Sequence, residues 1–409
     1  MNLNDKKSVN QITEHLFRNF YQEVFSSLVV KFGSVHLEII EDALQDTFLK
    51  AMKSWNFNEC PSNPKGWLFT VAKNLIVNQL KRNTKTISFN ISNFEIEVIT
   101  NEINEDAQLQ LLLACSKFKI KENAKLVFTL KAICGFGVTE IANCLLLSEE
   151  NVYKLLQRTK QKLKLLPKSY FENQSISEFS NTDINYLELI IYFMFNEGYD
   201  SVNSSSNKAI KKEICFEAVR LAHLLEKKSE KMSTKHLLAL CYFHMARFES
   251  RVNENGEFVS LRTQDRSKWD DEHIQFGFRY LRRPERLNRY YIEALIASMH
   301  IGAKEFSETN WEEILKLYDA LLQIIDTPVV RLNRSICMFE LGMNNEAIKE
   351  LEYIKPLLEN NYLYFSVSMA EYLEDKDIEL SKYWYMRSLE NTKQDFRKQI
   401  IRRRLAKIS

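Results

Sequence analysis

The clearest chemical pattern in this 409-residue chain lies near its beginning. Asp42, Gln45 and Asp46 recur at helical spacing, so they would share one face of a helix. Carboxylate and amide oxygens on such a face can accept hydrogen bonds from guanidinium groups, which suits an arginine-rich partner. An ordinary solvated helix face is the alternative interpretation.

An apolar stripe predicts the helix that would carry this face. Leu44, Phe48, Ala51, Met52 and Trp55 follow one side of an amphipathic helix. The segment after Trp55 reads NFNECPSNP and predicts a loop.

A second helix is predicted to follow this loop. Asn63 suits its N-cap, Pro64 its first position, and Leu68, Val71, Ala72 and Leu75 its buried side. Amide, hydroxyl and cationic side chains lie on another side, which could hold unpaired DNA bases and neutralise phosphates. They are Thr70, Lys73, Asn74, Asn78, Lys81 and Arg82. Trp67, taken alone, is more readily explained as a core residue than as a stacking platform.

A helix-turn-helix pattern runs from Glu122 to Leu163. One helix ends near Gly135, a second begins at Thr139, and Ser148 is placed to cap a third. In the third helix the predicted inner residues are Val152, Leu156, Thr159 and Leu163, and the outer ones are Asn151, Lys154, Arg158 and Lys162. A basic outer face of this kind fits the DNA major groove. Glu149 and Glu150 would either read cytosine amino groups or favour the positive end of the helix dipole.

The first of these regions resembles a known family. The segments EDALQDTF, NPKGWLFTVAKN and NQLKR are similar to the central region of bacterial sigma-70-type factors of the extracytoplasmic-function group. The resemblance implies docking on a coiled coil of the largest RNA polymerase subunit through Glu41, Asp42, Gln45 and Asp46. It implies contact with the −10 promoter element through Asn63, Lys65, Trp67, Lys73, Asn74, Asn78, Lys81 and Arg82. Many relatives carry Asp where this chain has Asn78, which leaves the role of that residue open.

The same resemblance covers the helix-turn-helix. It implies a domain that reads the −35 element and contacts the polymerase flap. The residues expected to do so are Ser148, Glu150, Asn151, Lys154, Arg158 and Lys162. We therefore expect a first domain over 1–85, a linker over 86–105 and a second domain over 106–170.

Residues 181–409 need a separate explanation. Apolar positions such as Ala347, Leu351 and Ile354, with Gly342 at a turn and Pro356 closing the helix, recur at an offset of about 32–34 residues, the length of a tetratricopeptide helical pair. The segments YFMFNEGYD and LRTQDRSKWDDEHI resemble motifs of a sigma subgroup with such a C-terminal extension.

Charged residues in these two segments leave two interpretations open. Glu197, Asp265, Arg266, Trp269 and Asp270 could form an acid–base site or structural ion pairs. The chain has no Gly-rich phosphate loop, nucleophile elbow or metal-spaced His pair, so the structural interpretation is favoured. His223, His236 and His244 are expected to pack on helix faces.

The overall composition favours an all-α fold, because 9 Gly and 6 Pro leave few helix breakers. The net charge of +2 excludes a general polyanion binder, although basic residues cluster locally, including a run from Arg397 to Lys407 that is expected to be a solvated face. Seven scattered cysteines without a C-x-x-C pair indicate reduced thiols. The apolar stretch from Tyr186 to Phe195 is too short to span a bilayer, and the first residues do not form a signal peptide, so a cytoplasmic protein is expected.

Together these patterns predict an alternative sigma factor with core RNA polymerase and promoter DNA as partners. No catalytic activity, cofactor, metal or membrane association is expected. The C-terminal helical domain would modulate the activity, with a protein or small molecule as its regulator. Two alternatives remain: a repeat-scaffold DNA-binding regulator that never docks on polymerase, and an enzyme or receptor fused to a promoter reader.

Overall fold

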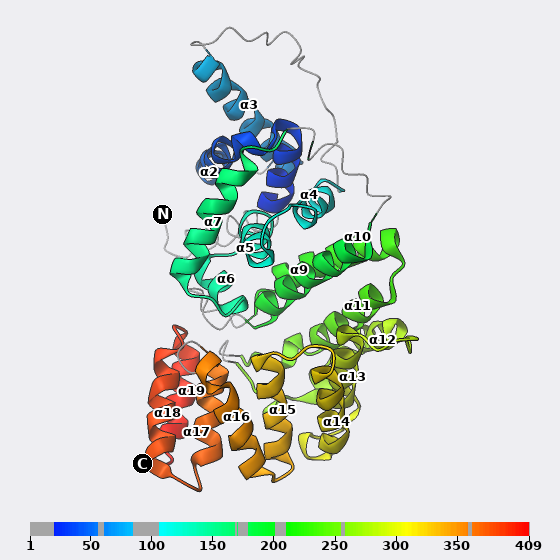
Figure 1. Ribbon diagram of the computed structural model, residues 1–409, viewed down its shortest axis with the longest axis vertical. Helices are drawn as coiled ribbons and strands as arrows, with labels where there is room; N and C mark the ends of the chain where they lie inside the picture. Colours follow the sequence, from blue (N-terminus) through cyan, green and yellow to red (C-terminus); the bar gives the residue numbers. More distant parts are fainter. Residues whose placement is uncertain are drawn as a thin grey trace. The chain divides into compact units, whose positions relative to one another are not determined.

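The computed structural model describes residues 20–55, 61–84, 106–167, 170, 179–200, 210–254, 258–358 and 362–408. Within these ranges nearly all regular structure is helical, and the only strand-like pairing is a single bridge between Val252 and Phe258 (Figure 1). The all-α prediction is therefore confirmed. The predicted linker over 86–105 lies outside the described residues.

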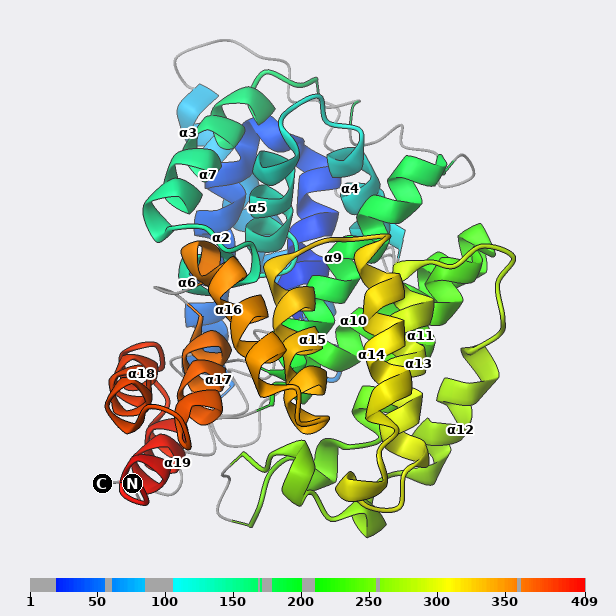
Figure 2. The same cartoon turned by 60° about the horizontal axis from the view of Figure 1, so that its bottom comes forward.

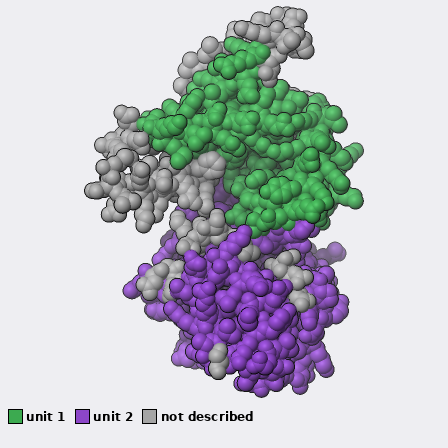
Figure 3. Space-filling view, turned by 90° about the vertical axis from the view of Figure 1, so that its left-hand side faces the viewer, with its two compact units in different colours: residues 1–141, 149–190 green, residues 142–148, 191–409 purple. Residues whose placement is uncertain are grey.

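The chain divides into two compact units, which Figure 3 colours separately. Unit 1 comprises residues 1–141 and 149–190, and unit 2 comprises residues 142–148 and 191–409. Two of the three dividing points fall inside helices, α6 (Val138–Cys144) and α9 (Asn181–Tyr199), and the third lies directly before Glu149.

The first part of unit 1 contains a helical segment over 20–32, the short 3₁₀ helix η1 (Ser34–His36), α2 (Leu37–Ser54) and α3 (Pro64–Thr84). Helices α2 and α3 pack on one another. The core beneath them is mostly apolar and includes Phe25, Leu28, Leu44, Phe48 and Leu68.

The second part of unit 1 contains α4 (Asp106–Ser116), α5 (Glu122–Ala132) and α7 (Glu149–Leu163), with α5 packed against both α4 and α7. Three buried hydrogen bonds join it to the first part, one of them donated by the Gln108 amide to the Gln22 side-chain oxygen over 3.4 Å. The Gln22 amide donates to the Cys134 carbonyl oxygen over 2.6 Å, and the Ser34 hydroxyl donates to the Leu163 carbonyl oxygen over 2.8 Å. Buried polar groups need such partners, so these bonds fix the register between the two parts.

The first half of α9 also belongs to unit 1. The Asp183 carboxylate accepts a hydrogen bond from Ser116 over 2.5 Å, and the hydroxyls of Tyr186 and Thr129 are 2.7 Å apart. The Lys125 ammonium lies 5.2 Å from the centre of the Tyr186 ring, within cation–π range. These contacts attach α9 to α4 and α5.

Unit 2 is a succession of helices in which most pack on their neighbours in sequence, while α12 and α13 both pack on α11 (Figure 2). They are α10 (Lys212–Ser229), α11 (Met232–Met245), α12 (Asp271–Tyr280), α13 (Arg289–Gly302), α14 (Trp311–Leu322), α15 (Pro328–Glu340), α16 (Asn344–Leu358), α17 (Leu363–Leu373), α18 (Ile378–Glu390) and α19 (Asp395–Leu405). Four short 3₁₀ helices connect them: η2 (Phe248–Ser250), η3 (Leu261–Thr263), η4 (Arg266–Lys268) and η5 (Phe306–Glu308).

The burial pattern of α15 and α16 recurs in α17 and α18. Buried residues of the first pair have buried counterparts about 34 residues later, the length of a helical-pair repeat. The matched pairs are Leu332 and Ser366, Ser335 and Met369, Met338 and Tyr372, Ala347 and Ser381, Leu351 and Tyr385, and Ile354 and Ser388. Gly342 occupies the turn of the first pair with a positive φ of 75°, as a tight helix-to-helix turn requires.

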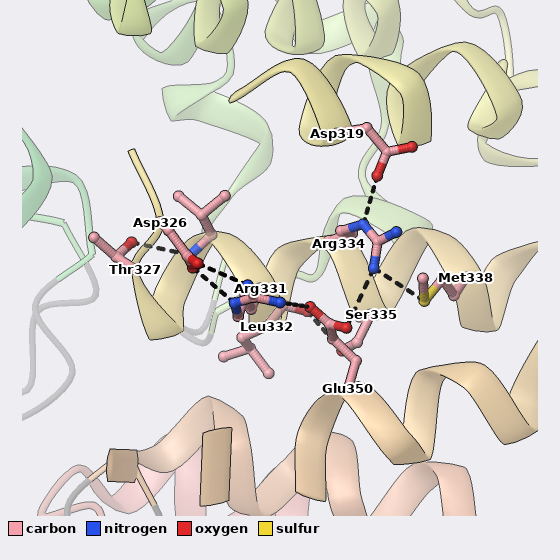
Figure 4. A network of polar contacts seen from close by, with 10 residues as sticks. Asp319, Asp326, Thr327, Arg331, Leu332, Arg334, Ser335, Met338 and Glu350 are labelled. Atoms are coloured by element: carbon pink, nitrogen blue, oxygen red, sulfur yellow. Dashed lines mark hydrogen bonds and ion pairs between the residues drawn. The ribbon is translucent and has the colours of Figure 1, made fainter. Parts of the chain in front are cut away.

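An ion-pair network joins α14, α15 and α16 (Figure 4). The Glu350 carboxylate accepts hydrogen bonds from Arg331 over 3.0 Å and from Arg334 over 3.2 Å. Arg331 also donates a hydrogen bond to Asp326, and Arg334 donates one to Asp319, each over 2.7 Å. The hydrogen bond with Asp326, followed by the one with Glu350, raises the pKa of Arg331. Arg334 thus links three successive helices, because it contacts Asp319 of α14 and Glu350 of α16.

A second network is built on Asp200, directly after α9. Its carboxylate is bonded to Arg397 and to the Tyr364 hydroxyl, and the Arg251 guanidinium lies 3.9 Å away. Arg397 and Arg251 are 5% and 6% exposed, so two nearly buried cations share this carboxylate. Burial would raise the pKa of Asp200, but the charges of Arg397 and Arg251 and the hydrogen bonds from Tyr364 and Arg397 together lower it, and the net shift is downward.

Two sequence predictions fail in this region. Arg397 was expected on a solvated basic face, yet it is buried because it pairs with Asp200. Pro356 was expected to end its helix, but α16 continues to Leu358. The last turn can accommodate the proline because Ala347, Leu351 and Ile354, all fully buried, anchor the helix before it.

Replacing Asp200 with Ala should destabilise unit 2 by about 3–5 kcal/mol at neutral pH, because it leaves two buried guanidinium groups without their carboxylate. Urea unfolding of the full chain measures the change. The Asp375→Ala variant removes an exposed carboxylate from the same unit and should unfold like the unsubstituted chain.

The pH dependence of the Asp200→Ala effect follows from the lowered pKa of that carboxyl. A lowered pKa means that the stabilisation is present above the unfolded-state value, near pH 4, and is lost as pH falls through the folded-state value. The difference between the two chains should therefore shrink below about pH 4. An undiminished difference at pH 2–3 would contradict the ionic origin of the effect.

Candidate nucleic-acid interface

Helix α2 separates a buried side from a mixed acidic and apolar face. Its buried residues are Leu37, Ile40, Ala43, Leu44, Thr47, Phe48 and Ala51. Asp42, Gln45 and Asp46 are all exposed, as is Leu49 at 53%. Met52 was predicted to lie on the buried side but is 41% exposed, because the buried side of α2 ends at Ala51. The exposed face thus offers two carboxylates and an amide beside two apolar side chains.

Glu41, predicted to belong to the same face, has a partner within the chain. Both of its carboxylate oxygens accept hydrogen bonds from the Lys160 ammonium of α7, over 2.9 and 2.7 Å. One turn earlier, Glu38 accepts from Lys164 over 2.8 Å. The hydrogen bond and charge of Lys164 lower the pKa of Glu38. No local signal in the sequence indicates Lys160 and Lys164 as these partners.

Helix α3 begins as its sequence predicts. The Asn63 side-chain oxygen accepts a hydrogen bond from the Gly66 amide over 2.9 Å, and Pro64 is the first helical residue. This bond satisfies one of the otherwise unpaired amides of the first turn. Lys65 forms an ion pair with Glu23, so its ammonium is directed to the protein in this conformation.

The outer face of α3 carries most of the predicted −10 residues. Asn74, Asn78, Lys81 and Arg82 are exposed, Thr70 is also exposed, and Lys73 is half-buried. Leu68, Ala72 and Ile76 are fully buried, whereas Val71 and Leu75 are only half-buried. The amide and cationic side chains thus lie opposite the core.

Trp67 is half-buried at the start of α3. Its ring centroid lies 5.1 Å from that of Trp55, in an edge-to-face arrangement with the planes at 62°. The two indoles come from the end of α2 and the start of α3, on either side of the loop that joins these helices. Trp67 is therefore neither a fully buried core residue nor a free platform.

Helix α7 has the two faces predicted from its sequence. Val152, Leu156, Thr159 and Leu163 are its buried residues, and Asn151, Lys154, Arg158 and Lys162 are exposed. Ser148, just before the helix, is exposed as well. The exposed side presents three cations on successive turns, an arrangement that can contact a phosphate backbone.

The two glutamates at the start of α7 have local partners. Glu149 accepts a hydrogen bond from the Thr139 hydroxyl over 2.6 Å, and Glu150 pairs with Lys154 over 2.6 Å one turn later. The turn before α7 contains Leu146 in a left-handed conformation with φ 53°. Such a backbone permits the short reversal between α6 and α7.

Comparisons with known proteins identify the first part of the chain. Residues 16–86 match the family model for sigma-70 region 2. This part of the chain is therefore similar to sigma-70 region 2. The chain is 28% identical over 161 residues to the RNA polymerase sigma factor YlaC of Bacillus subtilis (strain 168), which covers 37% of this chain and 89% of YlaC.

Two further relatives extend this result. The ECF RNA polymerase sigma factor SigM of Bacillus subtilis (strain 168) is 24% identical over 37% of this chain and 93% of its own length. An uncharacterized protein of Rhizobium meliloti (strain 1021) is 26% identical over 81% of this chain and 80% of its own length. No solved structure is significantly similar. Together the similarities support a sigma factor of the sigma-70 family.

Residues 185–285 match a family of unknown function, DUF6596, and this range contains both YFMFNEGYD and LRTQDRSKWDDEHI. Their charged residues have structural roles here. Glu197 pairs with the buried Lys211 over 2.9 Å, and Asp265 and Asp270 each cap the helix that follows them. Arg266 donates to two backbone carbonyls, one being that of Ala303 at 2.7 Å. These contacts agree with the structural interpretation of the residues.

The histidines of this region also pack within the fold. His223 bonds the Tyr242 hydroxyl over 2.8 Å, and His236 lies between the Arg282 carbonyl and the Asn288 side chain. Burial lowers the pKa of His244 well below its usual value. Among the described residues, no three His, Cys, Asp or Glu side chains are grouped as metal ligands would be.

The described cysteines and helices add two observations. Cys115, Cys134, Cys215, Cys241 and Cys337 are buried free thiols, and Cys144 is a half-buried one; Cys60 lies outside the described residues. No described helix is long and apolar enough to cross a membrane.

The Asn63→Ala substitution should weaken the first turn of α3 by about 1 kcal/mol, since it removes the N-cap hydrogen bond to Gly66. Amide hydrogen exchange on peptides covering residues 64–70 should become faster, while Asn63→Asp, which keeps an acceptor, should retain protection. Ser62→Ala changes the exposed neighbour and serves as the control. Unchanged exchange in Asn63→Ala would contradict the capping role.

Proposed function

We propose that this protein is an alternative sigma factor that binds core RNA polymerase and directs initiation at promoters with defined −35 and −10 elements. The observation that carries the proposal is the sigma-70 region 2 match, together with the exposed Asp42, Gln45, Asp46 and Leu49 face within it. A helix face of this kind can bind an arginine-rich coiled coil through charge-assisted hydrogen bonds around an apolar contact.

In this proposal α3 holds the −10 element. Asn74, Asn78, Lys81 and Arg82 form an exposed amide and cationic face, and Trp67 stands at its beginning. Unpaired bases can bind such a face by stacking and by amide hydrogen bonds while the cations neutralise phosphates. Lys65 and Asn63 would support this site through the Glu23 ion pair and the α3 N-cap.

Helices α6 and α7 act in this proposal as a helix-turn-helix that reads the −35 element. The exposed row of Asn151, Lys154, Arg158 and Lys162 supplies base and phosphate contacts, and Ser148 lies at its N-terminal end. The similarity to YlaC supports this assignment, because it spans 161 residues and so extends well beyond region 2.

Unit 2 acts in this proposal as a regulatory domain built from degenerate helical pairs. The recurrence of buried positions between α15–α16 and α17–α18 supports a tetratricopeptide-like stack. Such stacks bind partners through extended surfaces rather than through catalytic pockets, so the proposal includes no chemical activity of this domain.

The docking face is tested by the triple variant Asp42→Ala, Gln45→Ala, Asp46→Ala. All three side chains are exposed, so the fold should be kept while binding to core polymerase weakens at least 100-fold, because several charge-assisted hydrogen bonds are lost together. Duplex DNA binding should not change. Surface-bound core polymerase titrated with each protein gives the affinities, and the Asp375→Ala variant is the control.

Unchanged polymerase affinity in the triple variant would remove the docking assignment. If the unsubstituted chain bound promoter DNA but no core polymerase, the protein would instead be a repeat-scaffold DNA-binding regulator.

The −35 assignment is tested by Lys154→Ala, Arg158→Ala, Lys162→Ala in one chain. Affinity for duplex promoter DNA should fall, and the slope of log K against log salt should decrease by roughly 2–3, about 0.9 for each lost phosphate contact. Lys119→Ala, Lys121→Ala alters two exposed lysines of the α4–α5 connection and should leave the slope unchanged. An unaltered slope in the triple variant would place the DNA contacts elsewhere.

A further inference from the structure

Unit 2 contains a group of basic side chains beside the Asp200 network. They come from the end of α11, from the segments around η2 and η4, and from α13. We call them the basic cluster, and its members are His244, Arg247, Arg251, Arg266 and His300. Arg247 is 7% exposed, Arg251 is buried as well, and the other three are half-buried. Arginines are seldom buried unless they are paired with an acidic group.

Arg247 and Arg266 share the ring of one tryptophan. Their guanidinium carbons lie 5.8 and 4.6 Å from the centre of the Trp269 ring. Arg247 donates a hydrogen bond from its Nε to the Gln264 side-chain oxygen over 3.1 Å. Arg266 donates from its Nη1 to backbone carbonyls, whereas its buried Nη2 has no hydrogen-bond partner. Aromatic rings and neutral acceptors stabilise a guanidinium, but they do not cancel its charge.

The remaining members of the basic cluster also carry buried polar atoms without hydrogen-bond partners. These atoms are the Nε of Arg251 and the Nδ1 of His244 and of His300, and the Tyr199 hydroxyl beside them is another. The Arg251 guanidinium lies 3.7 Å from the centre of the Tyr199 ring, which is 4.6 Å from the His244 ring. Such atoms are rare in folded proteins, so several in one place point to a bound group that supplies their partners.

The basic cluster has little negative charge to balance it. In the described part of the chain, Asp200 is the one carboxylate in ion-pair contact with the cluster, and it also pairs with Arg397. Burial, together with the charges of Arg247 and Arg266, lowers the pKa of His300 to about 3. The positive charge is thus large enough to keep this imidazole neutral at pH 7. A buried charge without a counter-ion is costly, and an anion would supply one.

A groove of about 650 Å3 lies beside the basic cluster. Arg266 and Gln264, the hydrogen-bond partner of Arg247, are among the residues that line it. Arg262 and Lys304 add two cations to its lining, together with three hydroxyl and two carboxylate side chains. A polar groove of this size suits a small hydrophilic molecule.

We propose that the basic cluster binds the phosphate group of a small phosphorylated molecule, and that the groove holds the rest of that molecule. Guanidinium groups bind phosphate oxygens through paired hydrogen bonds, and a phosphate dianion carries more charge than a carboxylate. The Nη2 of Arg266 and the imidazoles of His244 and His300 are further donors. The site does not depend on the sigma assignment, and only a regulatory role for its ligand rests on the proposed function.

Binding is tested by isothermal titration calorimetry of the full chain at constant ionic strength. Inorganic phosphate should bind saturably, and glycerol 3-phosphate or adenosine monophosphate should bind roughly tenfold more tightly, since atoms in the groove add binding free energy. At a hundred times its Kd, each ligand should raise the Tm by about 5–10 °C.

Two results would overturn the phosphate site itself: none of these three probes binds, or malonate, a dicarboxylate, binds as tightly as phosphate. Equal affinities for inorganic phosphate and both esters would overturn the part of the proposal that concerns the groove.

The Arg247→Met variant separates an anion site from a structural arginine. Its phosphate affinity should fall about 100-fold. In phosphate-free buffer its Tm should equal or exceed that of the unsubstituted chain, because a buried charge without a carboxylate is removed and Gln264 keeps its contact with Ser250. The Arg283→Met variant makes the same change at an exposed position of unit 2 and should alter neither quantity.

Arg247→Lys guards against a folding defect in the methionine variant. It keeps the charge but loses the planar pair of donors, so its phosphate affinity should fall about tenfold. Phosphate affinity unchanged in both Arg247 variants would overturn the site and leave the sigma proposal intact. Failure of the unsubstituted chain to bind polymerase would overturn the proposed function and leave the phosphate site intact.

Discussion

The structure of unit 1 depends on the two-sided character of α2. One side, from Leu37 to Ala51, is buried and forms part of the core beneath α3 and the helical segment over 20–32. Burial of each large apolar side chain stabilises the fold by roughly 1.5–3 kcal/mol, so this side fixes the orientation of the helix. The other side then has to present its carboxylates outward. Glu41 pairs with Lys160 of α7 and Glu38 with Lys164 just after it, whereas Asp42, Gln45 and Asp46 are exposed.

Local patterns in the sequence predict much of this arrangement. The inner and outer residues of α7 agree with the structure, and Asn63 and Pro64 begin α3, because these features depend on helical periodicity and on a single turn. Met52 is exposed and Arg397 is buried, contrary to prediction, because burial at the edge of a stripe depends on which other element covers it. The Lys160–Glu41 and Arg397–Asp200 pairs are separated by long stretches of chain, so no local pattern indicates them.

Unit 2 uses its charged residues to hold helices together. Asp200 serves two nearly buried arginines, and Glu350 serves two half-buried ones. The residues that resemble a catalytic constellation in the sequence also have structural roles. Asp265 and Asp270 cap helices, and Glu197 forms an ion pair. Helix α9 contributes to both units, since Tyr186 bonds Thr129 in unit 1 and Glu197 pairs with Lys211 in unit 2.

The most direct measurement is transcription reconstituted from purified core polymerase, the full chain and a library of promoter sequences. The proposed function predicts transcripts that depend on the added chain, start at fixed positions and share one −35 and −10 pair. Two results together would contradict the account: the chain produces no more transcript than core polymerase does without it, and the chain does not bind the polymerase. In that case the sigma-70 region 2 fold would be present without its initiation function.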